Sequence, residues 1–298
     1  MDRRCLKYRL TDDEQAFFEK NGYLEIPDAL SKQKVREVRN ALEKVYAKER
    51  RKGLGPHETL HTRDFFKDDR VFVDLIDYYK TLPKVWGILG WNIHLYLAHA
   101  NVTPPEPEDS GRGIGLKWHQ DTSRVNVEME TSPRPRLSLK VAFFLSDVSE
   151  TGRGNFHIIP GSQKKDDLKF PKGDRGAKMR GAIPVLAKPG TAVIFDRRLW
   201  HSASANYWTE SRKAIFYGFS YRWLAPRGPC NVKKYWKDLD PIQRQLCRQV
   251  PEDVHRYTSP FDEDVPLKVW IEKHAGKEAG KVASRLSERP THRQQRSR

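Results

Sequence analysis

The N-terminal third of the chain carries apolar residues at helical spacing. Thr11 and Glu14 form a capping box that predicts the start of a helix, and Gly22 predicts its end. Ser31 predicts the start of a second helix, because apolar residues recur every three or four positions after it. The remaining predictions are an end of this helix at Gly53, a strand over 23–27, a helix over 71–82 that Pro83 breaks and a short helix over 84–90.

From Trp91 onward the pattern changes to short apolar or alternating runs between turns rich in Pro and Gly, which is typical of strands. Helices followed by many short strands predict a mainly β fold with flanking α-helices, in the form of a sandwich or barrel. We expect one domain over 1–272, in which helices over 1–90 brace a β core over 91–225 and an extension covers 226–272. The expected strands lie over 92–102, 137–148, 155–162, 182–188, 190–196 and 214–224.

Charge and composition narrow the class of protein. The net charge is +16, and residues 273–298 hold eight Lys and Arg against two Glu, which predicts a basic, disordered tail. No apolar run reaches the roughly 18 residues of a membrane helix, and the first residues lack the apolar core of a signal peptide, so we expect a cytoplasmic protein. Three widely spaced cysteines predict reduced thiols. The pattern predicts no particular oligomeric state.

A possible metal site comes from two residues in the stretch GLKWHQDTSR, which has the texture of a strand. His119 and Asp121 are two residues apart, so strand geometry would direct both side chains to one face. His201, at the end of a later apolar strand, supplies a third ligand. Two histidines and one carboxylate are the facial triad of non-haem Fe(II) oxygenases, which leaves positions open for a co-substrate and O2. The other interpretations are a surface ion pair and a structural strand-end histidine.

Arg212 strengthens the oxygenase interpretation. It follows His201 by eleven residues and opens the next strand. A 2-oxoglutarate molecule chelates iron through its keto acid and leaves its other carboxylate in need of a partner, which a planar guanidinium can bind with two hydrogen bonds. We therefore expect Fe(II) as cofactor and 2-oxoglutarate and O2 as co-substrates.

Four motifs together resemble the phytanoyl-CoA dioxygenase family of Fe(II)- and 2-oxoglutarate-dependent oxygenases, which includes the ectoine hydroxylases. The resemblance extends from about Leu10 to Leu224. Its motifs are TDDEQAFFEKNGYLEIPDALS near the N-terminus, the proximal WHQD, the turn GNFHIIPGSQ and the distal HSASAN followed by Arg212.

The resemblance implies a double-stranded β-helix, the cupin-like jelly roll, with the metal at its mouth. It implies that His119, Asp121 and His201 bind iron and that Arg212 binds the distal carboxylate of 2-oxoglutarate. It also places Gln120 and Ser204 near the co-substrate. Two positions depart from the family pattern: Gln163 replaces a usual His, and Thr103 stands where many relatives carry a basic residue. Because the carboxylate of Asp121 is retained, hydroxylation with release of succinate and CO2 is favoured over halogenation.

The substrate is expected to be a small molecule. Basic residues near the predicted entrance would suit an anionic substrate, although ordinary solvated surface charges explain them equally well. They are Arg124, Arg134, Arg136, Lys140 and Arg153. The positions of the aromatic residues in the sequence do not identify a substrate pocket. We expect His94, His99 and His157 to have structural roles.

Two other functions stay open. One is a nucleic-acid-directed oxygenase that uses the basic tail, which is disfavoured because no recognition module is evident. The other is a non-enzymatic jelly roll that holds a metal for structure or sensing, since the triad alone does not select iron. A structural zinc site would more often be closed by four ligands.

Overall fold

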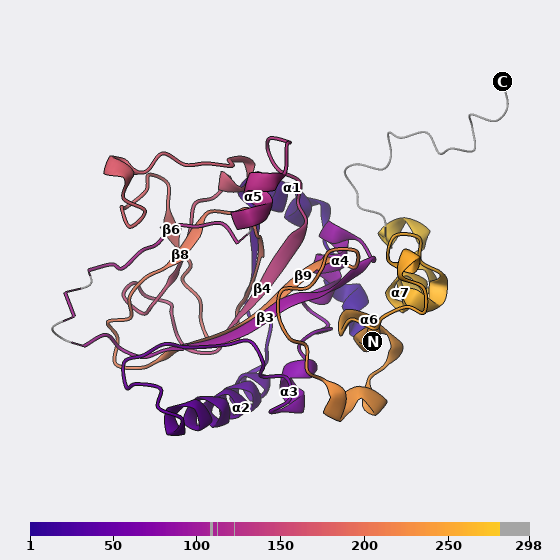
Figure 1. Ribbon diagram of the computed structural model, residues 1–298, viewed down its shortest axis with the longest axis horizontal. Helices are drawn as coiled ribbons and strands as arrows, with labels where there is room; N and C mark the ends of the chain where they lie inside the picture. Colours follow the sequence, from indigo (N-terminus) through magenta and orange to yellow (C-terminus); the bar gives the residue numbers. More distant parts are fainter. Residues whose placement is uncertain (108–109, 112, 122, 281–298) are drawn as a thin grey trace.

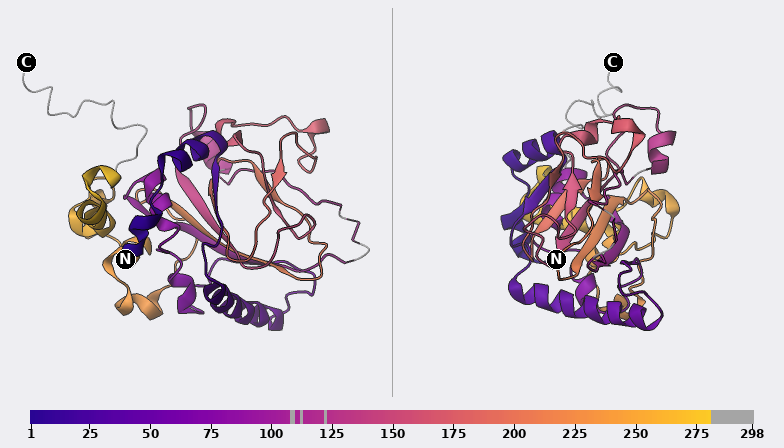
Figure 2. Two further views of the ribbon diagram at one scale, coloured as in Figure 1. Left: turned by 180° about the vertical axis from the view of Figure 1, so that it is seen from behind. Right: turned by 90° about the vertical axis from the view of Figure 1, so that its left-hand side faces the viewer.

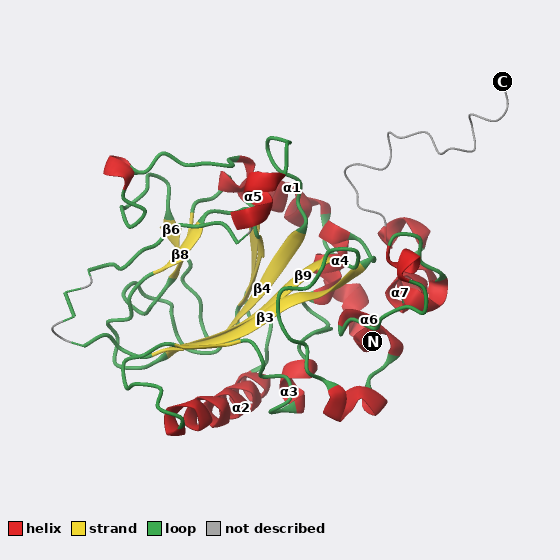
Figure 3. Cartoon of the chain, viewed as in Figure 1, coloured by secondary structure: helices red, strands yellow, loops and turns green. Residues whose placement is uncertain are grey.

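Two antiparallel sheets form the centre of the molecule in this computed structural model, which describes residues 1–107, 110–111, 113–121 and 123–280 (Figure 1). The major sheet has the order β1-β7-β4-β9-β3-β2, and the minor sheet has the order β6-β5-β8. Figure 3 shows the strands in yellow and the helices around them in red. The strands are β1 (Tyr23–Ile26), β2 (Leu60–Thr62), β3 (Ile93–Thr103), β4 (Ser138–Phe144), β5 (Phe156–Ile158), β6 (Ile183–Pro184), β7 (Ala192–Asp196), β8 (His201–Ala203) and β9 (Arg212–Tyr221).

Helices cover the outside of the major sheet. Figures 1 and 2 show α2 lying along that sheet, with α6 and α7 at the end of the molecule opposite the minor sheet. The helices are α1 (Asp12–Asn21), α2 (Lys32–Arg51), α3 (Arg70–Val73), α4 (Leu82–Leu89), α5 (Ser123–Glu128), α6 (Pro241–Leu246) and α7 (Pro266–Ala275). Short 3-10 helices lie at Arg3–Tyr8, Ser162–Lys164, Pro171–Gly173, Lys233–Asp238, Val254–Tyr257, Asp262–Asp264 and Lys277–Gly280.

Strand alternation gives the major sheet two different faces, because successive side chains point to opposite sides. On β4, Val141 and Phe143 join the core shared with the helices, whereas Ala142 and Phe144 join the core shared with the minor sheet. The same division holds on β9, where Ala214 packs on the inner side. Polar residues of inner parity therefore point into the space between the two sheets.

Helix capping follows the sequence pattern closely. Thr11 and Glu14 form the predicted capping box of α1, Gly22 ends it at φ 82°, and Ser31 caps α2. The predicted helix over 71–82 is wrong beyond Val73, where turns replace it. Pro83 starts α4 instead of breaking a helix, because a proline in the first turn loses no helical hydrogen bond.

The N-terminal segment supplies strands to the major sheet as well as helices outside it: the predicted strand over 23–27 is β1, whereas β2 was not predicted. β1 pairs with β7, and β2 pairs with β3. At the other end, α7 continues to Ala275, beyond the expected boundary at 272, and a 3-10 helix covers Lys277–Gly280. The rest of the predicted tail, 281–298, lies outside the described residues. The three cysteines are free thiols, and the described helices include none long and apolar enough to cross a membrane.

Candidate metal centre

The backbone brings His119, Asp121 and His201 together through a few local hydrogen bonds. The predicted strand around His119 is only an extended segment, which forms an isolated bridge with His201 in which each amide donates to the other residue's carbonyl at 3.0 Å. The Asp121 amide donates to the Arg197 carbonyl at 3.0 Å. One bridge is sufficient because the two-residue period still directs His119 and Asp121 to the same side.

The ligand atoms of these three residues lie within 4.8 Å of one another. Nδ1 of His119 lies 2.9 Å from the Lys117 carbonyl oxygen, and Nδ1 of His201 lies 2.8 Å from that of Leu199. A carbonyl only accepts, so each Nδ1 carries the proton and each Nε2 keeps a free lone pair. Burial, reinforced by nearby positive charge, lowers the pKa of His201 to about 3. The centre therefore offers Nε2 of each of the two imidazoles and one carboxylate, the donor set that suits Fe(II).

Two cations hold Asp121 in its ionised form. Lys140 Nζ lies 2.7 Å from Asp121 Oδ2, and Arg197 Nε lies 4.0 Å from the same oxygen. Although burial alone would raise the pKa of Asp121, the positive charges of Lys140 and Arg197 hold it well below its usual range. Arg197 also donates to the Asp121 carbonyl at 2.7 Å. Apart from these two cations, Oδ2 has no hydrogen-bond donor among the described residues, so the carboxylate can still accept a metal.

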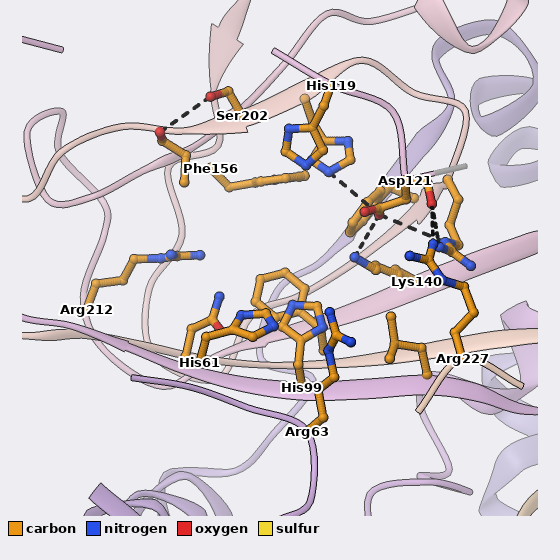
Figure 4. Close-up of a pocket in the computed structure, with 17 residues that line it drawn as sticks. His61, Arg63, His99, His119, Asp121, Lys140, Phe156, Ser202, Arg212 and Arg227 are labelled. Atoms are coloured by element: carbon orange, nitrogen blue, oxygen red, sulfur yellow. Dashed lines mark hydrogen bonds and ion pairs between the residues drawn. The ribbon is translucent and has the colours of Figure 1, made fainter. Parts of the chain in front are cut away.

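Arg212 is a buried cation with no ion pair among the residues that the structure describes; its guanidinium carbon lies 6.0 Å from the ring centres of Phe144 and Phe216. It opens β9, its side chain is 5% exposed, and its Nε finds no hydrogen-bond acceptor there. Burial lowers the pKa of Arg212 to about 10, so it is still charged at neutral pH. Its guanidinium points into the same cavity as the triad (Figure 4). An unpaired buried charge is costly, and a carboxylate entering this cavity would offset that cost.

Gln120 and Ser204 do not line this cavity. The Gln120 amide donates to the carbonyls of Lys165 and Arg198, since a residue between His119 and Asp121 points away from their common face. This placement is structural and does not support the predicted contact with the co-substrate. The Ser204 hydroxyl is buried without a hydrogen-bond partner among the described residues, and its role stays a prediction.

The cavity has a volume of about 240 Å³ and lies between the two sheets. Its apolar walls are formed by Phe156, Phe195 and Phe216, none of which sequence reasoning selected. His99 also lines it, because β3 directs His99 inward beside Phe216, with the two rings stacked at 4.5 Å, and its structural role stays a prediction. His94, in contrast, approaches a backbone carbonyl, that of Leu224, at 3.1 Å.

Of the basic residues expected at the entrance, only Lys140 lines the cavity. The arginines at 124, 134, 136 and 153 form ion pairs with carboxylates elsewhere, which matches the alternative of ordinary surface and structural charges. The cavity's other cations are Arg63, Arg197, Arg212 and Arg227. A lysine inside the apolar run LSLKVAFF was the one signal in the sequence that could have placed Lys140 at the site.

Comparison with known proteins agrees with this geometry. The model of the family described as "Phytanoyl-CoA dioxygenase (PhyH)" matches residues 18–214. The chain is 24% identical to the ectoine dioxygenase of Stutzerimonas stutzeri over 72% of this chain and 79% of that protein. It is also 24% identical to the L-proline trans-4-hydroxylase of Streptomyces griseoviridis over 73% of this chain and 89% of that protein.

Among solved structures, HygX from Streptomyces hygroscopicus with nickel and 2-oxoglutarate bound resembles the chain with a TM-score of 0.59 at 17% identity, covering 73% of this chain and 90% of HygX. This similarity confirms the predicted double-stranded β-helix, here with flanking helices and two open sheets among the described residues. The family match and the triad together identify the class of enzyme. The chain belongs to the phytanoyl-CoA dioxygenase family and is a non-haem iron dioxygenase that depends on 2-oxoglutarate.

Proposed function

We propose that this enzyme hydroxylates a C–H bond of a small-molecule substrate, with 2-oxoglutarate converted to succinate and CO2. His119, Asp121 and His201 would hold the metal, and Arg212 would bind the distal carboxylate of 2-oxoglutarate. The observation that carries this assignment is the buried Arg212, whose charge is left unpaired in the same cavity as an open-sided triad. A protein that held a metal only for structure would gain nothing from that cation.

Each group of residues has a separate task. Iron, once bound, supplies the oxidising chemistry, and three protein ligands leave room on it for co-substrates. Lys140 and Arg197 hold the Asp121 carboxylate ionised and in position. The phenylalanines of the cavity exclude water, which strengthens the attraction between Arg212 and a carboxylate.

The relatives support a small substrate. The names ectoine dioxygenase and L-proline trans-4-hydroxylase refer to small metabolites, and HygX has also been solved with hygromycin B bound. None of these three names or bound molecules refers to a nucleic acid, so they do not support the alternative of a nucleic-acid-directed oxygenase. Binding of an oligonucleotide at about 0.1 M salt would support that alternative. A cytoplasmic location is part of the same proposal.

The test is anaerobic loading with Fe(II) followed by titration with 2-oxoglutarate. Chelated Fe(II) with an open site is expected to give a charge-transfer band at about 500 nm. Asp121→Ala should abolish the band, and Arg212→Ala should weaken 2-oxoglutarate binding at least about thirtyfold. The control is Arg51→Ala, which removes an exposed arginine at the end of α2 and should leave the titration unchanged. Absence of the band in the iron-loaded wild type would overturn the proposed co-substrate.

A further inference from the structure

The side chains that line the cavity carry an excess of positive charge, which binding of the metal and the co-substrate together would not neutralise. Four arginines and one lysine line it, against the single carboxylate of Asp121. Fe(II) and the dianion of 2-oxoglutarate cancel each other in charge, so loading both would leave this excess unchanged. A low-dielectric space with such an excess favours an additional anion.

Three of the five cations have other tasks. Lys140 and Arg197 lie against Asp121. Arg212 would pair with 2-oxoglutarate in the function proposed above. Arg63 and Arg227 have no ion pair with a carboxylate in the part of the chain that the structure describes, although one nitrogen of Arg227 donates to the Asp121 carbonyl at 3.1 Å. Both are exposed, so they stand where the cavity opens to solvent.

Two separate segments bring Arg63 and Arg227 into one neighbourhood. A Cβ placed on Gly228, the residue after Arg227, would lie 3.9 Å from Cδ of Arg63. The Arg227 amide donates to the Tyr96 carbonyl at 2.9 Å, and the Arg248 guanidinium donates to the Gly228 carbonyl, so the backbone here is held in place. In Figure 4, Arg227 lies on the far side of Asp121 from Arg212, and Arg63 lies beside His99, between Arg212 and Arg227 and apart from both. An anion bound between Arg63 and Arg227 would not compete with the distal carboxylate of 2-oxoglutarate.

A flat wall runs along this part of the cavity. The rings of His61 and His99 stack at 4.8 Å, and those of His99 and Phe216 stack at 4.5 Å. Burial and the nearby positive charges, Arg63 and Lys140 among them, lower the pKa of both histidines, so the wall is uncharged at neutral pH. It offers an uncharged surface to the body of a substrate whose charged end is at the mouth.

Resting on the function proposed above, we infer that the substrate is a small organic anion whose carboxylate or phosphate is bound by Arg63 and Arg227 at the cavity mouth. Two guanidinium groups can give such an oxyanion several charge-assisted hydrogen bonds. The cavity of about 240 Å³ is below the usual range of ligand pockets, roughly 300–1,000 Å³, so it admits a small molecule or only the reacting end of a longer one.

The experiment measures anion binding to the Mn(II)-loaded enzyme saturated with 2-oxoglutarate, so that Arg212 is already occupied. Inorganic phosphate and acetate are the two probes, followed through the paramagnetic relaxation of their phosphorus and proton NMR signals. The variants are Arg63→Gln, Arg227→Gln and the exposed control Arg51→Gln. Because Arg227 Nη1 donates to the Asp121 carbonyl at 3.1 Å, its variant is compared at equal Mn(II) occupancy, and Arg63→Gln gives the cleaner result.

Saturable relaxation of at least one probe in the wild type, weakened about tenfold or more in Arg63→Gln and Arg227→Gln but not in Arg51→Gln, is the expected result. The probe that binds more tightly identifies phosphate or carboxylate as the preferred group. No saturable binding of either anion to the wild type, or equal binding to all variants, would overturn the inference. Failure of 2-oxoglutarate itself to bind would instead count against the proposed function, so the two failures are distinguishable.

Discussion

Two buried carboxylates, Asp196 and Asp121, have very different surroundings. Asp196 is fully buried, and the Arg198 guanidinium donates to both of its oxygens, at 3.0 and 2.7 Å, while Arg136 donates to Oδ2 at 2.9 Å. Arg136 continues to Glu19, which completes a closed network of charges. Asp121 has an ion pair with Lys140, yet apart from Lys140 and Arg197 its Oδ2 has no hydrogen-bond donor among the described residues.

The surroundings of Asp196 are those of a site that stabilises the fold, whereas the surroundings of Asp121 are those of a site that binds a ligand. Around Asp196, every charge has its partners within the protein. Around Asp121, one carboxylate oxygen has only cations as partners, and the Nε of Arg212 lacks a hydrogen bond within the described structure. Buried polar atoms without partners are rare in folded proteins, and where they occur together in a cavity they point to function.

The largest effect on stability is expected from Asp196→Ala, which leaves Arg136 and Arg198 buried without their common partner. We expect the free energy of unfolding to fall by about 3–5 kcal/mol at neutral pH, measured by urea denaturation. Burial alone would raise the pKa of Asp196, but Arg198 and Arg136 lower it below the ordinary 3.8. A depressed pKa stabilises the fold above the ordinary value, so the difference between variant and wild type should shrink as the pH falls below about 4.

An exposed pair provides the control for this measurement. Glu37→Ala removes the partner of Lys34 on the surface of α2 and should leave the midpoint of urea denaturation unchanged, because exposed ion pairs contribute little to stability. If Asp196→Ala were equally harmless, the closed network would not be a stabilising feature.

The next effect concerns Lys140, the counterion of Asp121. In Lys140→Met, the Asp121 carboxylate loses its nearest cation, so we expect the metal-free protein to lose about 2 kcal/mol of stability. A divalent metal would then replace the lysine as counterion and no longer be repelled by it, so the affinity for Mn(II) should rise by about tenfold. Electron paramagnetic resonance of free Mn(II) measures this affinity.

Lys213→Met is the matched control for Lys140. Lys213 is also a buried lysine of the major sheet, but it pairs with Glu43 at 2.9 Å. Its loss should leave the affinity for Mn(II) unchanged. Weaker metal binding in Lys140→Met would mean that this lysine mainly orients Asp121, and the counterion interpretation would be wrong.

A smaller gain in stability is expected from Arg212→Met. The substitution removes a buried charge that the apo protein leaves unpaired, so the free energy of unfolding should rise by about 1–2 kcal/mol without ligand. Added 2-oxoglutarate should stabilise the wild type but not the variant, which thermal unfolding with and without the co-substrate would detect. A destabilised variant would show that Arg212 serves the fold and not a ligand.

The smallest effect comes from Asp77, a third carboxylate outside both regions, which accepts a hydrogen bond from the Gln243 amide at 3.1 Å. Burial raises the pKa of Asp77 to about 6. Its ionisation therefore costs stability as the pH rises from about 4 to 6. Asp77→Asn should stabilise the protein by about 1 kcal/mol at pH 7 and have no effect near pH 4, as measured by urea denaturation. Equal effects at the two pH values would contradict the assigned pKa.

Local signals in the sequence predicted much of the fold. The caps at Thr11 and Ser31 act over three or four residues, so the helix starts could be placed accurately. The helix expected over 71–82 failed because the same apolar residues can be buried from turns as well as from a helix. The pairing of β1 with β7 joins segments about 170 residues apart, and no local pattern encodes such a contact.

At the candidate site, too, local patterns predicted some residues and missed those that long-range contacts bring together. Spacing was enough to bring His119 and Asp121 to one face, and the order of the strands brought His201 to them. Lys140 could be named only as one of several basic residues, because its direction depends on which face of β4 turns inward. Arg63 and Arg227 could not be found at all, since they meet through loops whose course depends on the tertiary structure.

The position of Arg227 has a consequence for how this enzyme could diversify. The triad and Arg212 lie within residues 18–214, the part that the family model matches, whereas Arg227 follows that part on a separate segment held by Arg248. A lineage could replace this segment and change the molecules it accepts while leaving the iron ligands in place. One half of the anion site inferred above, Arg227, would then evolve apart from the iron ligands, whereas the other half, Arg63, lies within the matched part.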